Sequence, residues 1–221
     1  QTCALPIYRL MAQIKPHFFY NVMNTIMGFC LTDPERAYEL LGDFSGLIRR
    51  RLSLSETQRF ISLREELDLV RAYLKIEQAR FGNALDWEIR CEMDESLSMS
   101  PLLLEPLVEN AVKHGVREKA GGGRVTVDIG LDGGEMRFQV ADNGVGMTAE
   151  RLREVLADDA EGIGLRNIRR RLQLEYRRTL HITSRPGEGT TVWFSLPLPA
   201  VAHPEINTGG GSPHDPSPAG R

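Results

Sequence analysis

Several features that often narrow a protein's function are scarce or missing in this chain of 221 residues. It has only three cysteines, an odd number without CxxC spacing, which excludes a disulfide framework and a cysteine-based zinc site. It contains no run of about 18 apolar residues, so no segment is predicted to cross a membrane. Its net charge is only −3, and we expect the arginine runs at 49–51 and 169–171 to be solvated helix faces. The sequence therefore gives no indication of nucleic-acid binding.

The composition is otherwise that of an ordinary globular protein, with 41% hydrophobic and 26% charged residues. The length suits one or two domains. The chain begins with Gln1 and carries no signal-peptide pattern. We therefore expect it to be part of a longer protein.

Apolar residues recur at three- and four-residue spacing through the first third of the chain, which is the period of amphipathic helices. The predicted helices cover residues 9–31, 34–54 and 63–81. Pro16 is expected to kink the first helix, and Ser62 to cap the third together with Glu65 or Glu66. An apolar helix face this long must be covered by another protein surface, and we predict that a second copy of the chain covers it in a homodimer. The residues predicted at the dimer surface are Phe18, Val22, Ile26, Leu40, Phe44 and Leu47.

The rest of the chain mixes strand and helix patterns. The predicted strands are residues 86–92, 125–131, 136–140, 180–184 and 191–196, and the predicted helices are 101–115, 149–156 and 165–177. The fold class is therefore α+β. We expect a helical dimerisation domain at 8–82, an α/β sandwich of antiparallel strands and helices at 83–199, and a disordered tail at 200–221.

Two stretches of the second domain carry polar groups suited to a nucleotide. On the helix at 105–115, the Asn110 amide oxygen is a ligand type that Mg²⁺ accepts, and Lys113 could reach a phosphate. Directly after a strand, the Asp142 carboxylate could accept a hydrogen bond from an adenine amino group. Taken alone, the first stretch could equally be a core helix, and the second an ordinary turn.

Two glycine-rich stretches complete the pattern. At residues 161–167 a GxG sequence leads into a helix, where backbone N–H groups can bind phosphate. Residues 187–191 precede the last strand and by themselves indicate a hairpin loop. Neither the GxGxxG nor the GxxxxGK[ST] pattern occurs, so the Rossmann fingerprint and the Walker P-loop are excluded.

In this order and spacing, the four stretches closely resemble the nucleotide-binding boxes of the Bergerat-fold ATPases, which include DNA gyrase, heat-shock chaperones and histidine kinases. The resemblance implies ATP and Mg²⁺ as cofactors. It makes Asn110 the Mg²⁺ ligand, Asp142 the adenine contact and residues 147–162 a short ATP lid. The other implied ATP-binding residues are Lys113, His114, Gly144, Gly146, Gly162, Gly164, Leu165 and Thr190.

ATP-hydrolysing members of that group place a water-activating Glu four residues before the Mg²⁺-binding Asn. Here that position is Pro106, which cannot act as a base, so transfer to an acceptor is favoured over hydrolysis. The stretch at 13–24 resembles the phospho-acceptor box of LytS-like sensor kinases, and the stretch at 73–81 matches the same family. By this resemblance His17 is the phosphoryl acceptor, and Asn21, one turn on, is a candidate orienting group.

The resemblance implies a two-component histidine kinase core that autophosphorylates and passes the phosphoryl group to an Asp of a response regulator. It also implies a cytoplasmic domain of an inner-membrane sensor, anchored by an upstream segment. Two alternatives stay open. One is a Bergerat-fold ATPase that drives a conformational cycle, and the other is a non-catalytic dimerisation module with a vestigial nucleotide pocket.

Overall fold

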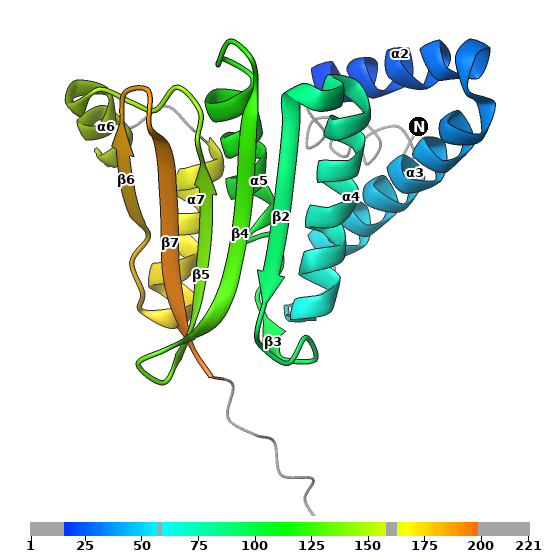
Figure 1. The fold of residues 1–221 in the computed structure, drawn as a ribbon. Coiled ribbons are helices and arrows are strands. Elements are labelled where there is room, and N and C mark those ends of the chain that lie inside the picture. Colours follow the sequence, from blue (N-terminus) through cyan, green and yellow to red (C-terminus); the bar gives the residue numbers. More distant parts are fainter. Residues whose placement is uncertain (1–15, 57–58, 158–162, 199–221) are drawn as a thin grey trace, which may run out of the picture.

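The structure is a computed structural model that describes residues 16–56, 59–157 and 163–198 (Figure 1). The predictions for the start of the first helix, for Gly162, for part of the ATP lid and for the tail at 200–221 fall outside these residues. Within the described ranges, no helix is long and apolar enough to cross a bilayer.

Three helices form the N-terminal part, close to where the apolar period predicts them. They are α2 (Pro16–Thr32), α3 (Pro34–Glu56) and α4 (Leu63–Phe81). Asp33 separates the first two, and its Oδ1 accepts the backbone N–H of Arg36 at 3.1 Å. The predicted capping box is confirmed at the start of α4. Ser62 Oγ accepts the N–H of Glu65 at 3.2 Å, and the Glu65 carboxylate accepts the N–H of Ser62 at 2.8 Å.

The apolar stripe of α2 and α3 is covered by α4 of the same chain. Val22, Ile26, Leu40, Phe44 and Leu47 are all buried, and α4 packs against both other helices. The prediction that this stripe is the dimer surface is therefore wrong. The sequence pattern identifies an apolar face, but it cannot tell whether the covering partner comes from the same chain or from another copy.

The C-terminal part is built on a five-stranded sheet in the order β2-β4-β5-β7-β6. Its strands are β2 (Leu85–Cys91), β4 (Gly123–Asp132), β5 (Glu135–Asp142), β6 (His181–Arg185) and β7 (Gly189–Pro197). Four of them pair antiparallel as predicted, whereas β2 runs parallel to β4. Parallel neighbours need a long crossover, and here a helix supplies it between the two strands. A further short pair joins β1 (Ile61–Ser62) to β3 (Ser98–Met99).

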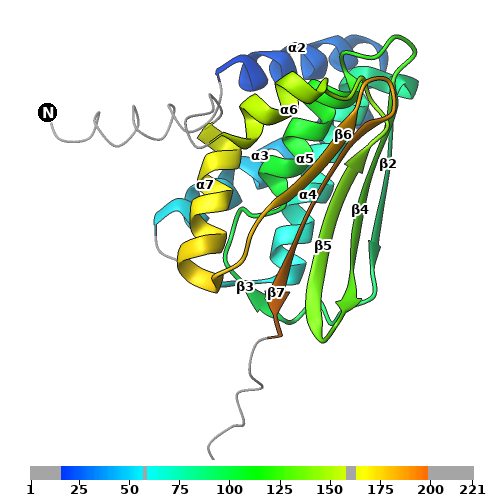
Figure 2. The same ribbon diagram turned by 90° about the vertical axis from the view of Figure 1, so that its left-hand side faces the viewer.

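Helices cover one face of this sheet, and the other face is left open (Figure 2). They are α5 (Glu105–Asn110) with its π-helical continuation η2 (Ala111–Val116), α6 (Ala149–Leu156), and α7 (Ile163–Arg171) with the π-helical η3 (Leu172–Tyr176). A short 3-10 turn, η1 (Gly82–Ala84), links α4 to β2. The helix predicted from residue 101 begins only at Glu105, because Leu102 takes a left-handed conformation with φ of 57°.

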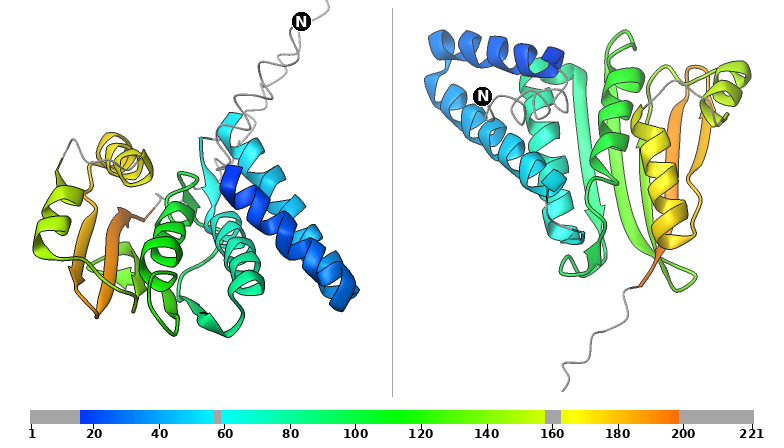
Figure 3. Two further views of the ribbon diagram at one scale, coloured as in Figure 1. Left: turned by 90° about the horizontal axis from the view of Figure 1, so that it is seen from above. Right: turned by 180° about the vertical axis from the view of Figure 1, so that it is seen from behind.

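The two parts share one buried core. Helix α4 lies between them and packs against α2 and α3 as well as against α5 and β2 (Figure 3). The buried apolar residues form a single cluster that runs from Val22 in α2 to Leu196 in β7. The helix that carries Asn110 is therefore seated directly on the helical part.

Candidate nucleotide-binding site

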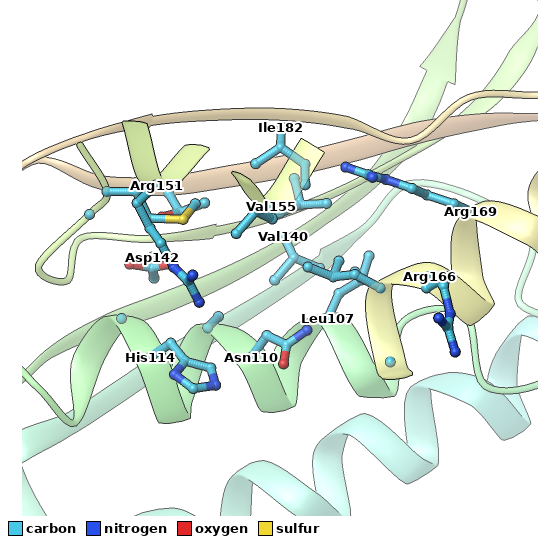
Figure 4. Close-up of a pocket in the computed structure, with 18 of the residues that line it drawn as sticks. Leu107, Asn110, His114, Val140, Asp142, Arg151, Val155, Arg166, Arg169 and Ile182 are labelled. Atoms are coloured by element: carbon cyan, nitrogen blue, oxygen red, sulfur yellow. The ribbon is translucent and has the colours of Figure 1, made fainter. Parts of the chain in front are cut away.

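A cavity of about 630 Å³ lies between the sheet and its helices, within the usual size range of small-molecule sites. Helices α5 and η2 form one wall, strands β5, β6 and β7 another, and α6 and α7 close it from the side (Figure 4). Its apolar lining comes from Leu107, Val140, Val155, Ile182 and Val192. Polar and charged side chains stand at its two ends.

Asp142, the last residue of β5, is the buried acid of this cavity, and only 9% of it is exposed. Its Oδ1 accepts the backbone N–H of Gly144 at 2.9 Å. Burial raises the pKa of the Asp142 carboxyl above its ordinary value, while backbone hydrogen bonds from Gly144 and Thr190 act in the opposite direction. A buried carboxylate with a spare lone pair suits an amino group, such as that of a purine base.

Close backbone packing holds this carboxylate in place. A Cβ added to Gly115 would lie 2.3 Å from Asp142 Oδ1, and one added to Gly144 would lie 2.1 Å from the carbonyl carbon of Gly115. Gly146 has a φ of 64°, and a Cβ there would meet the carbonyl oxygen of Arg185. Gly144 and Gly146 were predicted from the sequence. Gly115 was missed as a site residue, since its position suggested only a helix end.

Thr190 reaches the cavity through a small hydroxyl network at the start of β7. Its Oγ1 lies 2.8 Å from Ser184 Oγ, which in turn accepts the backbone N–H of Met147 at 2.9 Å. The network ties β6 and β7 to the loop that follows β5. Thr190 and Met147 both line the cavity.

Asn110 lies half-exposed on the helix wall, and His114 follows one turn later. His114 Nδ1 is 3.5 Å from the carboxylate of Glu118. Lys113 is exposed and is not among the residues that line the cavity. Across the described ranges, no three His, Cys, Asp or Glu side chains gather into a group that could hold a metal ion. A cation here would need oxygen ligands from a bound phosphate beside the Asn110 amide, which fits Mg²⁺ as a nucleotide-bound ion.

Four arginines line the cavity, and none of them was assigned to the site from the sequence. Arg166, Arg169 and Arg170 belong to α7, whereas Arg151 belongs to α6 and lies beside Asp142, at the end opposite Arg166 and Arg169 (Figure 4). The run at 169–171 is thus not only a solvated face: Arg169 Nη1 also donates to the carbonyl of Leu156 at 3.1 Å, and Arg171 Nη1 to that of Pro101 at 2.6 Å. Predicted residues Gly164 and Leu165 lie beside these arginines and also line the cavity.

The charges of the cavity are therefore ordered along its length. Asp142, His114 and Arg151 stand at one end, and the arginines of α7 stand at the other, with Asn110 between them (Figure 4). Arginine fits phosphate because its guanidinium donates two parallel hydrogen bonds. The arrangement matches a ligand with an amino-bearing base at one end and phosphates at the other.

His17 lies apart from this cavity, in the first turn of α2, and is exposed. The amide nitrogen of Asn21 lies 2.9 Å from its Nδ1 and 3.2 Å from its Nε2. No residue of α2, α3 or α4 appears among the described cavity-lining residues. The structure thus pairs the two predicted acceptor residues with each other but does not bring them to the cavity.

Two family models match the chain and between them cover most of it. Residues 6–85 match the model described as "Histidine kinase", and residues 100–200 match "Histidine kinase-, DNA gyrase B-, and HSP90-like ATPase". The chain belongs to the histidine kinase family. It carries the kinase core of a two-component system, a transferase core whose second half is an ATP-binding domain.

Several curated proteins are similar over most of the chain. The putative uncharacterized protein YwpD of Bacillus subtilis is 40% identical over 86% of this chain and 69% of its own length. The sensor protein LytS of Bacillus anthracis is 38% identical over 86% of this chain, and the sensor histidine kinase YpdA of Escherichia coli is 34% identical over 85%. The chain spans about a third of the length of these two sensors.

Solved structures agree on the fold. The histidine kinase domain of a blue-light activated kinase from Erythrobacter litoralis superposes with a TM-score of 0.50 at 19% identity, over 74% of this chain and 75% of that one. The catalytic domain of the histidine kinase ThkA gives a TM-score of 0.50 at 15% identity, over 63% of this chain and 95% of that one. The predicted fold class, a helical part followed by a Bergerat-type ATP-binding domain, is confirmed.

Proposed function

We propose that the chain binds ATP with Mg²⁺ in this cavity and transfers the γ-phosphoryl group to the imidazole of His17. The observation that supports the proposal best is the order of charges along the cavity, from buried Asp142 to the arginines of α7. Residues 8–82 would then form the acceptor part and residues 83–199 the nucleotide-binding part.

Each cavity residue has a role in this proposal. Asp142 accepts a hydrogen bond from the adenine amino group, while Gly144 and Gly146 let the backbone approach the base. Arg166 and Arg170, with the N-terminal end of α7, bind the phosphates. Asn110 would hold Mg²⁺, which neutralises phosphate charge when bound.

His17 has the properties of an acceptor. It is exposed, and Asn21 contacts the ring and orients it. The nitrogen of a neutral imidazole that carries no proton is a competent nucleophile. An N–P bond forms while the bond between the γ-phosphorus and the bridging oxygen breaks, and ADP leaves.

The structure gives a further argument against ATP hydrolysis as the main activity. Glu105, the acidic residue on the side of Pro106 away from Asn110, is buried and ion-paired with Arg51. Neither it nor Glu109 is among the described residues that line the cavity. The two acidic residues nearest Pro106 and Asn110 in the sequence are therefore absent from the described cavity lining, which favours transfer over the ATPase alternative.

The test is incubation with γ-labelled ATP. We expect acid-labile, alkali-stable label that disappears in His17→Gln while ATP affinity stays within about threefold of wild type. His114→Gln should slow labelling or weaken ATP binding without removing the labelled product, because His114 lies on the cavity wall. Reversed phenotypes would assign the acceptor to His114 instead.

The same proposal names partners for the whole protein. The phosphoryl group would pass to an Asp of a response regulator, and the protein would act as a homodimer on the cytoplasmic side of a membrane sensor. The second copy would cover exposed apolar residues of α2 and α3, namely Tyr20, Met27, Leu31, Tyr38 and Leu41. Tyr20→Glu with Leu31→Glu should yield a folded monomer in sedimentation. A dimer of unchanged affinity would place the interface elsewhere.

A further inference from the structure

The nucleotide-site helix α5 is anchored at its first turn by a side chain from the helical part. Glu66 of α4 is fully buried, and its carboxylate accepts three backbone N–H groups. These belong to Leu102 and Leu104 at 2.7 Å each and to Glu105 at 3.3 Å. They are the unpaired N–H groups of the tight turn and helix start, which Glu66 satisfies from another element.

A second anchor holds the side chain of Glu105, whose backbone N–H already bonds to Glu66. Arg51 of α3 forms an ion pair with Glu105, and the two side chains are only 15% and 4% exposed. The prediction that the run at 49–51 is a solvated face is therefore wrong for Arg51. Buried charges are retained in pairs because an unpaired one is costly.

Arg51 also reaches the acceptor helix. Its guanidinium carbon lies 5.7 Å from the ring centre of Phe18, the residue directly after His17. The Phe18 ring stacks on Tyr73 of α4, with ring centres 5.6 Å apart and planes inclined by 28°. One continuous set of contacts thus joins the start of α2 to the start of α5.

We propose that Arg51 and Glu66 are positioning residues of the kinase, which fix α5, and with it Asn110, relative to the helical part. The inference rests on the proposed function, since it assigns Asn110 to the Mg²⁺-phosphate end of the site. The adenine end is built from β5, the loop before β7 and η2, and η2 is the part of this helix that lies farthest from the anchored first turn. Loss of either anchor should therefore impair the Mg²⁺-dependent part of nucleotide binding and leave the adenine-dependent part in place.

Glu66→Gln is the sharpest variant, because it keeps the volume of the side chain. The glutamine has one acceptor oxygen where the carboxylate has two, so its NH₂ group faces at least one of the three N–H donors. For the second anchor, Arg51→Met would leave Glu105 buried without its partner. The double variant Arg51→Met/Glu105→Gln removes both charges and keeps this anchor testable if the single variant does not fold.

Binding of a non-hydrolysable ATP analogue is measured by calorimetry in EDTA and again with Mg²⁺. In Glu66→Gln, in Arg51→Met and in the double variant, we expect the affinity in EDTA to stay within twofold of wild type. The gain in affinity on adding Mg²⁺ should fall at least fivefold. The rate of His17 labelling should fall at least tenfold, since misplacement of a reacting group by about 1 Å can cost about a hundredfold.

Matched controls lie next to each anchor. Arg50 pairs with Asp68 at 3.4 Å and so ties α3 to α4 without touching α5, and Glu65 only caps α4. In Arg50→Met and Glu65→Gln, the affinity in EDTA, the affinity with Mg²⁺ and the rate of His17 labelling should all stay within twofold of wild type.

The inference is overturned if Glu66→Gln and the double variant keep the full Mg²⁺ gain, or if they lose affinity equally with and without Mg²⁺, which is the result of a general folding role. Failure of the proposed kinase function is a different outcome, a wild-type chain without label on His17. In that case too, the calorimetric comparison with and without Mg²⁺ still shows whether Arg51 and Glu66 position Asn110.

Discussion

Replacing Gly115 by alanine places a methyl group against the carboxylate of Asp142. The added Cβ would lie 2.3 Å from Oδ1 and 2.4 Å from Cγ, so the carboxylate must withdraw by about 1 Å to reach ordinary contact. The obstructing atoms are the end of a side chain, and Gly115 does not need a positive φ. The fold should therefore survive, because the side chain of Asp142 can turn aside while the backbone stays.

The substitution should instead lower the affinity for ATP, because the displaced carboxylate can no longer reach the adenine amino group. A hydrogen bond to a charged group contributes about 1.5 to 3 kcal/mol, so its loss should weaken ATP binding by about 10- to 150-fold. Calorimetry gives the affinity, and circular dichroism reports the fold. Gly130→Ala is the matched control, because its Cβ would meet only Glu92 Oε2, at an ordinary 3.9 Å. If the folded Gly115→Ala chain binds ATP as tightly as the control, the carboxylate of Asp142 is not the adenine contact.

Three further predictions use other parts of the molecule. Burial raises the pKa of Glu66 from 4.5 to about 7, so the folded chain keeps a proton that the unfolded chain releases between these values. The free energy of unfolding should fall by about 3 kcal/mol as pH rises through this window, and Glu66→Gln should remove that slope in urea titrations. Leu47→Ala should cost about 2 to 5 kcal/mol at every protein concentration, whereas a dimer-surface role would make the loss depend on concentration. Mixing His17→Gln with Asn110→Asp chains should restore label that neither has alone, and a mixture without label would exclude transfer between copies.

Local rules predicted the features that depend on neighbours in sequence. The capping box at Ser62 needs only Glu65 three residues later. Strand alternation located β5, and with it Asp142 at the strand end. Family membership adds the order of the nucleotide-binding stretches, which no single stretch could establish.

Features that depend on distant partners could not be predicted in this way. Arg51 is one of three consecutive arginines, and only its partner Glu105, 54 residues away, distinguishes it from its exposed neighbours. Glu66 resembles a second capping acid but turns inward to the backbone at 102–105. The parallel pairing of β2 likewise depends on the path of the chain between strands, which residue alternation does not encode.

The positions of His17 and the cavity bear on how the phosphoryl group is transferred. In-line attack requires the acceptor nitrogen to come within about 3 to 3.5 Å of the phosphorus, yet the described cavity walls include nothing from α2. Within one chain, that approach needs α2 or the nucleotide-binding part to move, and a movement of α5 away from the helical part would strain the contacts that Arg51 and Glu66 make with its first turn. If those anchors are needed for transfer, as proposed, transfer to His17 of a second copy is a route that leaves them intact. The mixing experiment therefore tests the anchors as well as the acceptor, because recovery of label between copies is an outcome that lets both remain in place.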